Sequence, residues 1–162
     1  MMAGALNAVR AAAVELLERY GVPAVAGMEP AARVRQSGPV AAVSLSRVVC
    51  AAGGFQDYLG VKDGDELYGR AVELTLSLDL YAPRDGGESA CQTAFAALAE
   101  ALTCGDLAGL TVTEIAGGRV EFLAKDGLYR LPVTCRCGGW MVARVDDSGA
   151  FTDFKIEGRT VG

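Results

Sequence analysis

The first amphipathic pattern lies near the N-terminus and predicts a helix. Apolar side chains recur there at steps of three and four residues, a spacing that gathers them on one face of an α-helix. Asn7 is the expected N-terminal cap, and Gly21 followed by Pro23 is typical of a helix end. The apolar positions of this expected helix are Leu6, Val9, Ala13, Leu16, Leu17 and Tyr20.

Two later segments have the composition and alternation of strands. Residues 22–39 contain three prolines and are expected to be mostly loop, with room for a short strand at 23–28. Val40–Cys50 is rich in β-branched residues and predicts a strand. Residues 72–80 alternate strictly and stop before Pro83, so we expect one buried face and one face turned to water or to a partner. The polar face of this strand carries Glu73, Thr75, Ser77 and Asp79.

Residues 53–66 are expected to form an extended loop. The segment is polar and rich in glycine, yet it carries Phe55, Tyr58 and Leu59. A loop of this length is long for a compact domain. Two interpretations are equally open: the apolar side chains form a contact surface for another protein, or they fold back as a small satellite core.

A second helix is expected after the turn at residues 84–89. Its apolar stripe ends at Gly105, which is typical of a helix C-terminus. The Asp85-Gly86-Gly87-Glu88 turn resembles an anion-binding turn only weakly, because its carboxylates would repel a phosphate; capping of the helix is the favoured interpretation. The apolar stripe is Cys91, Phe95, Leu98 and Leu102.

The last third of the chain predicts five strands, at residues 110–115, 119–124, 128–137, 140–145 and 150–157. Glycine-containing turns separate them, including Gly138-Gly139. Pro132 interrupts the third strand, which is therefore expected to be an edge strand or to carry a bulge. The whole pattern predicts one α+β domain over residues 1–162, with two helices packed on a mostly antiparallel, mixed β-sheet in a single-layer sandwich.

Composition disfavours several classes of function and leaves the predicted fold unchanged. The chain has 162 residues, a net charge of −5 and no concentrated basic face, which disfavours nucleic-acid binding. It contains no histidine, which removes the most common general base and metal ligand. No segment reaches the ~20 apolar residues of a membrane span, and the first residues lack a signal-peptide pattern, so an intracellular protein is expected.

The candidate chemical motifs favour structural explanations. Cys135 and Cys137 should share one face of a strand, but a closed zinc site needs four ligands and the other three cysteines are scattered. The acidic cluster Asp63, Asp65 and Glu66 lacks the order of a calcium loop. We therefore expect no metal, no cofactor and no catalytic residues, and a protein that works by assembling with others.

The middle of the chain carries a resemblance to a known family. The long alternating strand ends in Asp79-Leu80-Tyr81-Ala82-Pro83, a short acidic glycine turn follows, and an amphipathic helix and further strands come next. With the preceding helix and strand, this order over residues 3–145 resembles the tail terminator proteins of long-tailed bacteriophages and related tail-like particles.

The resemblance implies a ring, typically a homohexamer, that caps the tail tube and stops its polymerisation. It implies the tail tube protein and a neck or head-completion protein as partners. Assembly in the bacterial cytoplasm and a final place at the head-proximal end of the tail are implied as well. On this reading Phe55, Tyr58 and Leu59 would dock on a neighbouring subunit, and the polar face of strand 72–80 would line a channel.

Other interpretations stay open. Another head–tail joining or tail-completion protein would share the composition, and a small ligand-binding α+β domain unrelated to phages is the alternative from a different class. The C-terminal segment 147–162 exceeds the family pattern, and its strand-like part either pairs with a neighbouring subunit or closes the edge of the sheet.

Overall fold

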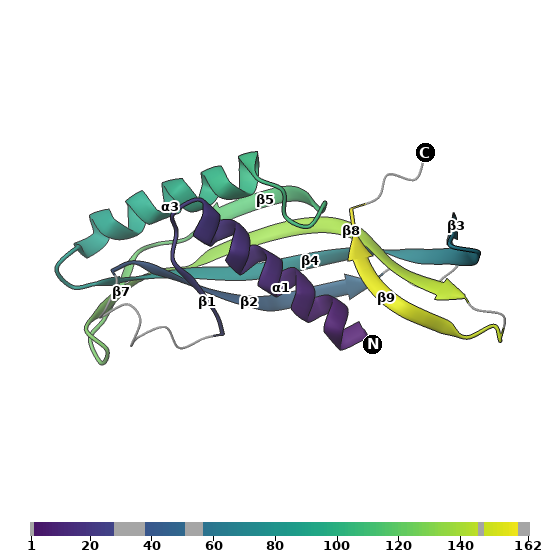
Figure 1. Cartoon of the computed structure of the whole chain (residues 1–162). Helices are drawn as coiled ribbons and strands as arrows, with labels where there is room; N and C mark the ends of the chain where they lie inside the picture. The colour runs from purple at the N-terminus through teal and green to yellow at the C-terminus, as the bar shows by residue number, and fades with distance from the viewer. Residues whose placement is uncertain (1, 28–37, 51–56, 146–147, 159–162) are drawn as a thin grey trace.

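The computed structural model describes residues 2–27, 38–50, 57–145 and 148–158. In these residues two helices lie on one face of a long, twisted, nine-stranded sheet, which confirms the predicted α+β class (Figure 1). The helices are α1 (Met2–Arg19) and α3 (Gly87–Cys104). The strands are β1 (Ala24–Ala26), β2 (Val40–Cys50), β3 (Asp57–Lys62), β4 (Asp65–Pro83), β5 (Thr111–Gly117), β6 (Glu121–Leu123), β7 (Leu128–Leu131), β8 (Val133–Val145) and β9 (Phe151–Glu157).

Strand β4 is the central strand of the sheet, because it is 19 residues long and pairs with other strands along both of its edges. β3 and β2 follow one another along one edge, and β8 and β7 follow one another along the other. β8 in turn pairs with β5 near its start and with β9 near its end. All these pairs are antiparallel, and β1 with β2 is parallel, so the sheet is mixed as expected.

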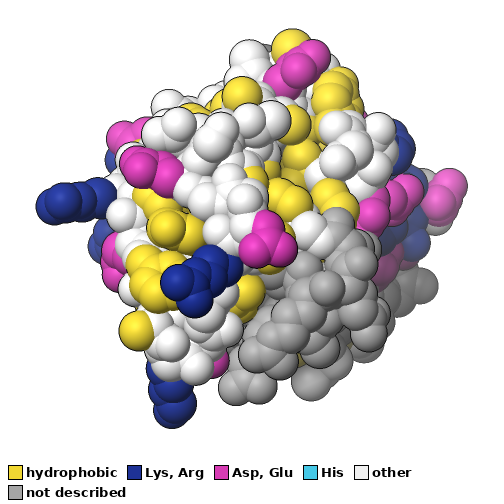
Figure 2. Space-filling model, turned by 90° about the vertical axis from the view of Figure 1, so that its left-hand side faces the viewer, with side chains coloured by type: hydrophobic (Ala, Val, Ile, Leu, Met, Phe, Trp, Pro, Cys, Tyr) yellow, Lys and Arg dark blue, Asp and Glu magenta, His cyan; other side chains and the backbone are white. Residues whose placement is uncertain are grey.

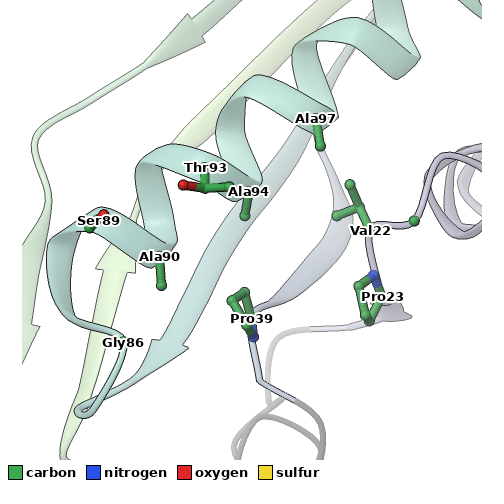
Figure 3. Close-up of a pocket in the computed structure, with 10 residues that line it drawn as sticks. Val22, Pro23, Pro39, Gly86, Ser89, Ala90, Thr93, Ala94 and Ala97 are labelled. Carbon is green, nitrogen blue, oxygen red and sulfur yellow. The ribbon is translucent and has the colours of Figure 1, made fainter.

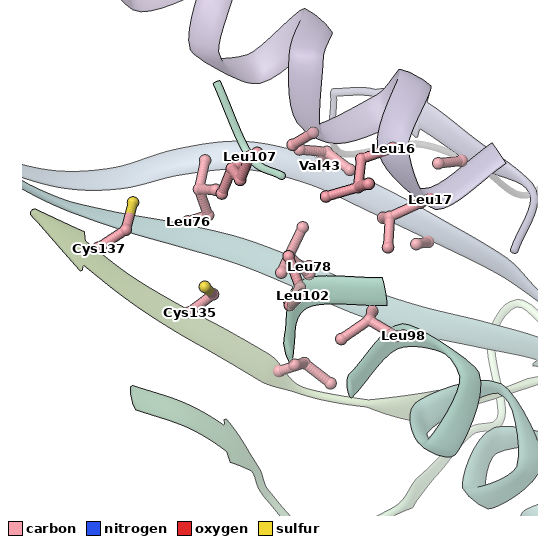
Figure 4. Close-up of a cluster of buried hydrophobic side chains, with 14 of the residues drawn as sticks. Leu16, Leu17, Val43, Leu76, Leu78, Leu98, Leu102, Leu107, Cys135 and Cys137 are labelled. Carbon is pink, nitrogen blue, oxygen red and sulfur yellow. The ribbon is translucent and has the colours of Figure 1, made fainter. Parts of the chain in front are cut away.

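The core lies between the two helices and the sheet. Leu16 and Leu17 of α1 and Leu98 of α3 point toward Leu76 and Leu78 of β4 (Figure 4). All five side chains are almost completely buried. Burying one leucine side chain contributes about 1.5–3 kcal/mol, so this layer supplies much of the driving force for folding.

The end of α1 agrees with the sequence pattern, and its start does not. Gly21 has φ +79°, and the N–H groups of Gly21 and Val22 donate to the carbonyls of Glu18 (3.1 Å) and Leu17 (2.9 Å). This pair of bonds is the Schellman motif that glycine at this position permits. The helix already begins at Met2, so the prediction of Asn7 as its cap is wrong; the alanine-rich residues before Asn7 are good helix formers and extend the helix.

The predicted capping of the second helix is also wrong in its detail. α3 starts after Gly86, which makes no side-chain cap hydrogen bond, and neither Asp85 nor Glu88 caps it. Glu88 still lies in the first turn, where a negative charge interacts favourably with the helix dipole. At the other end the Gly105 N–H donates to the Ala101 carbonyl at 2.9 Å, as expected of a terminal glycine.

The predicted extended loop at 53–66 is, in its described part, a β-hairpin. β3 and the start of β4 pair with Lys62 opposite Asp65, and Asp63-Gly64 forms the two-residue turn between them. Their φ values of +52° and +86° fit a type I′ turn, for which Asp-Gly is a preferred sequence. The segment therefore extends the sheet well beyond residues 72–80.

Two further boundaries differ from the sequence prediction. Pro132 separates β7 from β8, because it has no N–H to donate to the ladder. Gly138-Gly139 does not form a turn, and β8 runs through it. A Cβ at Gly139 would lie 2.6 Å from the Glu157 carbonyl oxygen, so glycine here allows close approach of β9. β9 itself closes the edge of the sheet beside β8, one of the two expected alternatives.

Candidate protein-interaction surfaces

One end of the sheet continues beyond the helices. β3, the first part of β4, the last part of β8 and the first part of β9 lie side by side there (Figure 1). Neither helix covers this end of the sheet (Figure 1). Side chains that would be buried elsewhere on this face are therefore exposed at this end.

Three aromatic side chains follow one another across that end, and we call Tyr58, Tyr68 and Phe151 the aromatic row. Tyr58 lies opposite Tyr68 in the strand register, with ring centroids 5.5 Å apart and an interplanar angle of 65°. Tyr68 and Phe151 are 6.4 Å apart at 85°. Edge-to-face arrangements of this kind are favoured between aromatic rings. Tyr58 is 55% exposed and Phe151 43%, so the row is a solvent-facing apolar surface.

The central ring of the row has a second constraint. The Tyr68 hydroxyl donates a hydrogen bond to the Glu66 carboxylate at 3.1 Å. This bond, with desolvation and the negative charge of Glu66 as smaller causes, raises the pKa of Tyr68 above its ordinary value of 10.0. The phenol therefore stays protonated at neutral pH and can donate this hydrogen bond.

The three residues that the sequence predicts to form the loop contact differ in where they lie. Phe55 lies outside the described residues. Tyr58 is exposed, whereas Leu59 packs on the opposite face of the sheet, where a Cβ on Gly69 would meet it at 2.7 Å. Leu59 therefore folds back onto the sheet, whereas Tyr58 stays on the surface, where its contact with another protein remains a prediction.

Sequence reasoning missed Tyr68, Phe151 and the 60% exposed Val61. One signal was present, because Asp63-Gly64 is a preferred sequence for a two-residue hairpin turn. A regular hairpin around this turn would place Leu59 opposite Tyr68, and the register shift between Tyr58 and Gly60 brings Tyr58 there instead.

The polar face of β4 is turned away from the helices and carries a network of charges. Arg136 on β8 pairs with Glu73 at 3.1 Å and with Glu114 on β5 at 3.8 Å. Thr75 and Ser77 lie half-buried between these charges and the next ion pair along the strand. Glu73, Thr75 and Ser77 therefore share one face, as their spacing predicts.

Asp79 departs from the expected pattern, because its carboxylate is used within the subunit. It is only 6% exposed. Arg130 binds it at 2.7 Å, the Val133 N–H donates to it at 3.2 Å, and the Ser77 hydroxyl donates at 3.3 Å. The hydrogen bond to Asp79 is the largest cause that raises the pKa of Arg130 above its ordinary value, so the arginine stays charged. This cluster fixes β7 and β8 to β4 on either side of Pro132.

The paired cysteines of β8 are core residues. Cys135 and Cys137 point into the layer between the helices and the sheet (Figure 4) and are fully buried. Desolvation raises the pKa of Cys135 to about 12 and that of Cys137 to about 11. Both thiols are protonated at neutral pH, and a protonated thiol is a poor nucleophile and metal ligand. Within the described part of the chain, no three Cys, Asp or Glu side chains gather as they would around a metal ion.

A groove lies toward the opposite end of the molecule, between α3 and the segment that links α1 to β1. Its volume is about 550 Å³, within the range of ligand-sized clefts. Figure 2 shows hydrophobic side chains exposed at this end of the molecule, and Figure 3 shows residues that line the groove. None of the described residues that line it is charged; its apolar walls are Val22, Pro23, Pro39, Ala90, Ala94 and Ala97, and Ser89 and Thr93 add hydroxyl groups.

Neither described helix combines the length and the hydropathy needed to cross a bilayer. No known family model matches the sequence, and no curated protein matches it. Among solved structures, the fold is similar to a chain of the "Virion of native gene transfer agent (GTA) particle", with a TM-score of 0.39 and 18% sequence identity. The match covers 84% of this chain and 95% of that chain. At this score and identity the likeness bears on neither the function nor the partners of the protein.

Proposed function

We propose that this chain is a structural protein of a phage or a prophage tail-like particle, and that it forms a ring that caps the tail tube. In this role it stops polymerisation of the tube protein and offers a surface to a neck or head-completion protein. The proposal takes its class from the order of elements over residues 3–145, which resembles tail terminator proteins. It places the protein in the bacterial cytoplasm during assembly and at the head-proximal end of the finished tail.

The observation that carries the proposal is the aromatic row at the uncovered end of the sheet. Exposed aromatic side chains on strands are common anchors of protein interfaces, where Tyr and Trp contribute much of the binding energy. A ring requires each subunit to present a surface on which the next one docks. The long strands β4 and β8 carry that surface away from the body of the subunit, which suits contact with a neighbour.

The chemistry of the chain agrees with a role in assembly. The sequence has no histidine, the paired thiols are buried and protonated, and Arg136 of the polar face is paired with Glu73 and Glu114. The groove beside α3 is the one feature that favours the alternative of a small ligand-binding domain. None of its described lining residues is charged, which suits an apolar side chain of another protein.

Native mass in solution tests the proposal. The purified chain is measured by light scattering coupled to size exclusion over a range of concentrations and salt. We expect a stable hexamer, or a monomer that converts to rings as the concentration rises, with rings visible by negative-stain microscopy. A monomer at every concentration contradicts the proposal.

A further inference from the structure

We propose that the aromatic row of one subunit docks in the groove beside α3 of a second copy of this chain, so that subunits join head to tail. The inference rests on the proposed ring and specifies its contact. It assigns each of the two surfaces to the other and requires no further partner.

The groove has the form of a receptor for aromatic rings. Its walls carry short side chains, among them Ala90 and Ala94 on α3, with Pro23 and Pro39 opposite (Figure 3). Short side chains on a rigid helix leave room for a ring to approach the backbone closely. Burial of a large aromatic side chain there removes apolar surface of both partners from water, the main driving force of association.

The polar groups of the two surfaces also match. Ser89 and Thr93 place hydroxyl groups at the groove, and Tyr58 brings a phenol hydroxyl. A tyrosine has an apolar body and a polar tip, and the groove offers apolar walls with hydroxyl groups beside them. A strongly charged partner would lose water without gaining an opposite charge from the described lining residues, because none of them is charged.

Position within the molecule decides between contact inside one chain and contact between copies. The row lies on β3, β4 and β9 at the end of the sheet beyond the helices. The groove lies at the N-terminal half of α3, toward the opposite end (Figures 1 and 3). The two surfaces cannot meet within a subunit. A contact between two different patches is heterologous, and repeating it closes a ring when the rotation permits.

Two variants test the two surfaces of this contact one at a time. Tyr58→Ser combined with Phe151→Ser removes the row, and Thr93→Trp fills the groove from an exposed position on α3 that leaves the core untouched. Phe122→Ser is the matched control for the row, since Phe122 is 45% exposed and lies on β6 outside both surfaces. Ala96→Trp is the control for the groove, since Ala96 is exposed on α3 and does not line it. Circular dichroism confirms that each variant is folded.

We expect the row variant and the groove variant each to raise the dissociation constant of the oligomer at least about tenfold, as loss of a central interface anchor does. Both controls keep the wild-type mass. An equimolar mixture of the two defective variants retains one intact contact, the row of the groove variant in the groove of the row variant. The mixture should therefore yield dimers and no ring.

The outcomes are distinct. A wild-type oligomer that survives both variants overturns the docking inference and leaves the proposed ring standing. Defective variants whose mixture stays monomeric also overturn it, because the two surfaces then do not bind each other. A wild-type chain that is monomeric at every concentration overturns both the inference and the proposed function.

Discussion

At the scale of single residues, Asp79 shows how one carboxylate holds three strands together. It accepts hydrogen bonds from Arg130 of β7, from the backbone of Val133 at the start of β8 and from Ser77 of its own strand. Arg130 is 31% exposed and also lies 3.9 Å from Glu121, so the main loss on removing Asp79 is the acceptor of the buried Val133 N–H. We predict that Asp79→Ala lowers the free energy of unfolding by about 2 kcal/mol. Urea denaturation measures the difference.

Glu73 supplies the matched control for Asp79. Its pair with Arg136 is exposed on both sides, and exposed ion pairs contribute about 0–1 kcal/mol. Glu73→Ala should therefore change the unfolding free energy by less than about 1 kcal/mol. Equal effects of the two substitutions would show that burial of Asp79 contributes nothing.

The buried thiols lead to a prediction about pH. The pKa values of about 12 and about 11 for Cys135 and Cys137 lie above the ordinary value of 9.0. The unfolded state therefore ionises first, so these thiols do not change stability below about pH 9 and reduce it as the pH rises above that value. At pH 10 each thiol should lower the unfolding free energy by about 1.4 kcal/mol relative to pH 8.

The double variant Cys135→Ala with Cys137→Ala isolates this contribution. Wild type and variant are unfolded in urea at both pH values, and the variant should lose less stability between them. A thiol reagent gives an independent measurement on the wild type: exposed Cys104 should react in the native state, whereas Cys135 and Cys137 should react only after unfolding. Rapid native labelling of the pair would contradict their burial.

At the scale of elements, the sequence predicts what periodicity controls. α1 and the 72–80 part of β4 follow from their apolar spacing, because one face of each must be buried against the other layer. The β3–β4 hairpin was missed, since the glycines of residues 53–66 were interpreted as loop signals and Asp63-Gly64 was not recognised as a turn. Which strands pair over long distances, such as β5 and β9 on either part of β8, depends on tertiary contacts that local patterns do not contain.

The two adjacent glycines of β8 differ in whether the surrounding structure leaves room for a side chain. A Cβ at Gly139 would collide with Leu110 and with the Glu157 backbone, whereas a Cβ at Gly138 would have only the Val72 carbonyl oxygen near it, at 3.9 Å. We predict that Gly139→Ala destabilises the protein by about 1–3 kcal/mol, because β9 must shift away from β8. Gly138→Ala should be neutral or slightly stabilising, since alanine has less backbone entropy to lose. Thermal unfolding compares the two, and equal shifts in Tm would contradict the close approach of β9.

At the scale of the whole molecule, a ring contact between the aromatic row and the groove and a ring contact through the polar face predict opposite effects of salt on the oligomer. Each subunit carries a net charge of −5, so copies repel one another at long range, and salt screens this repulsion. If the aromatic row and the groove form the ring contact, the dissociation constant of the oligomer should stay constant or fall as NaCl rises from about 0.05 M to about 0.5 M, because apolar burial is not screened. If Glu73, Arg136 and the other charges of the polar face carried the contact, the same increase in salt would weaken the oligomer. Light scattering at fixed protein concentration across this salt series distinguishes the two contacts. The Tyr58→Ser, Phe151→Ser variant is the control: any oligomer that it still forms should dissociate as the salt concentration rises.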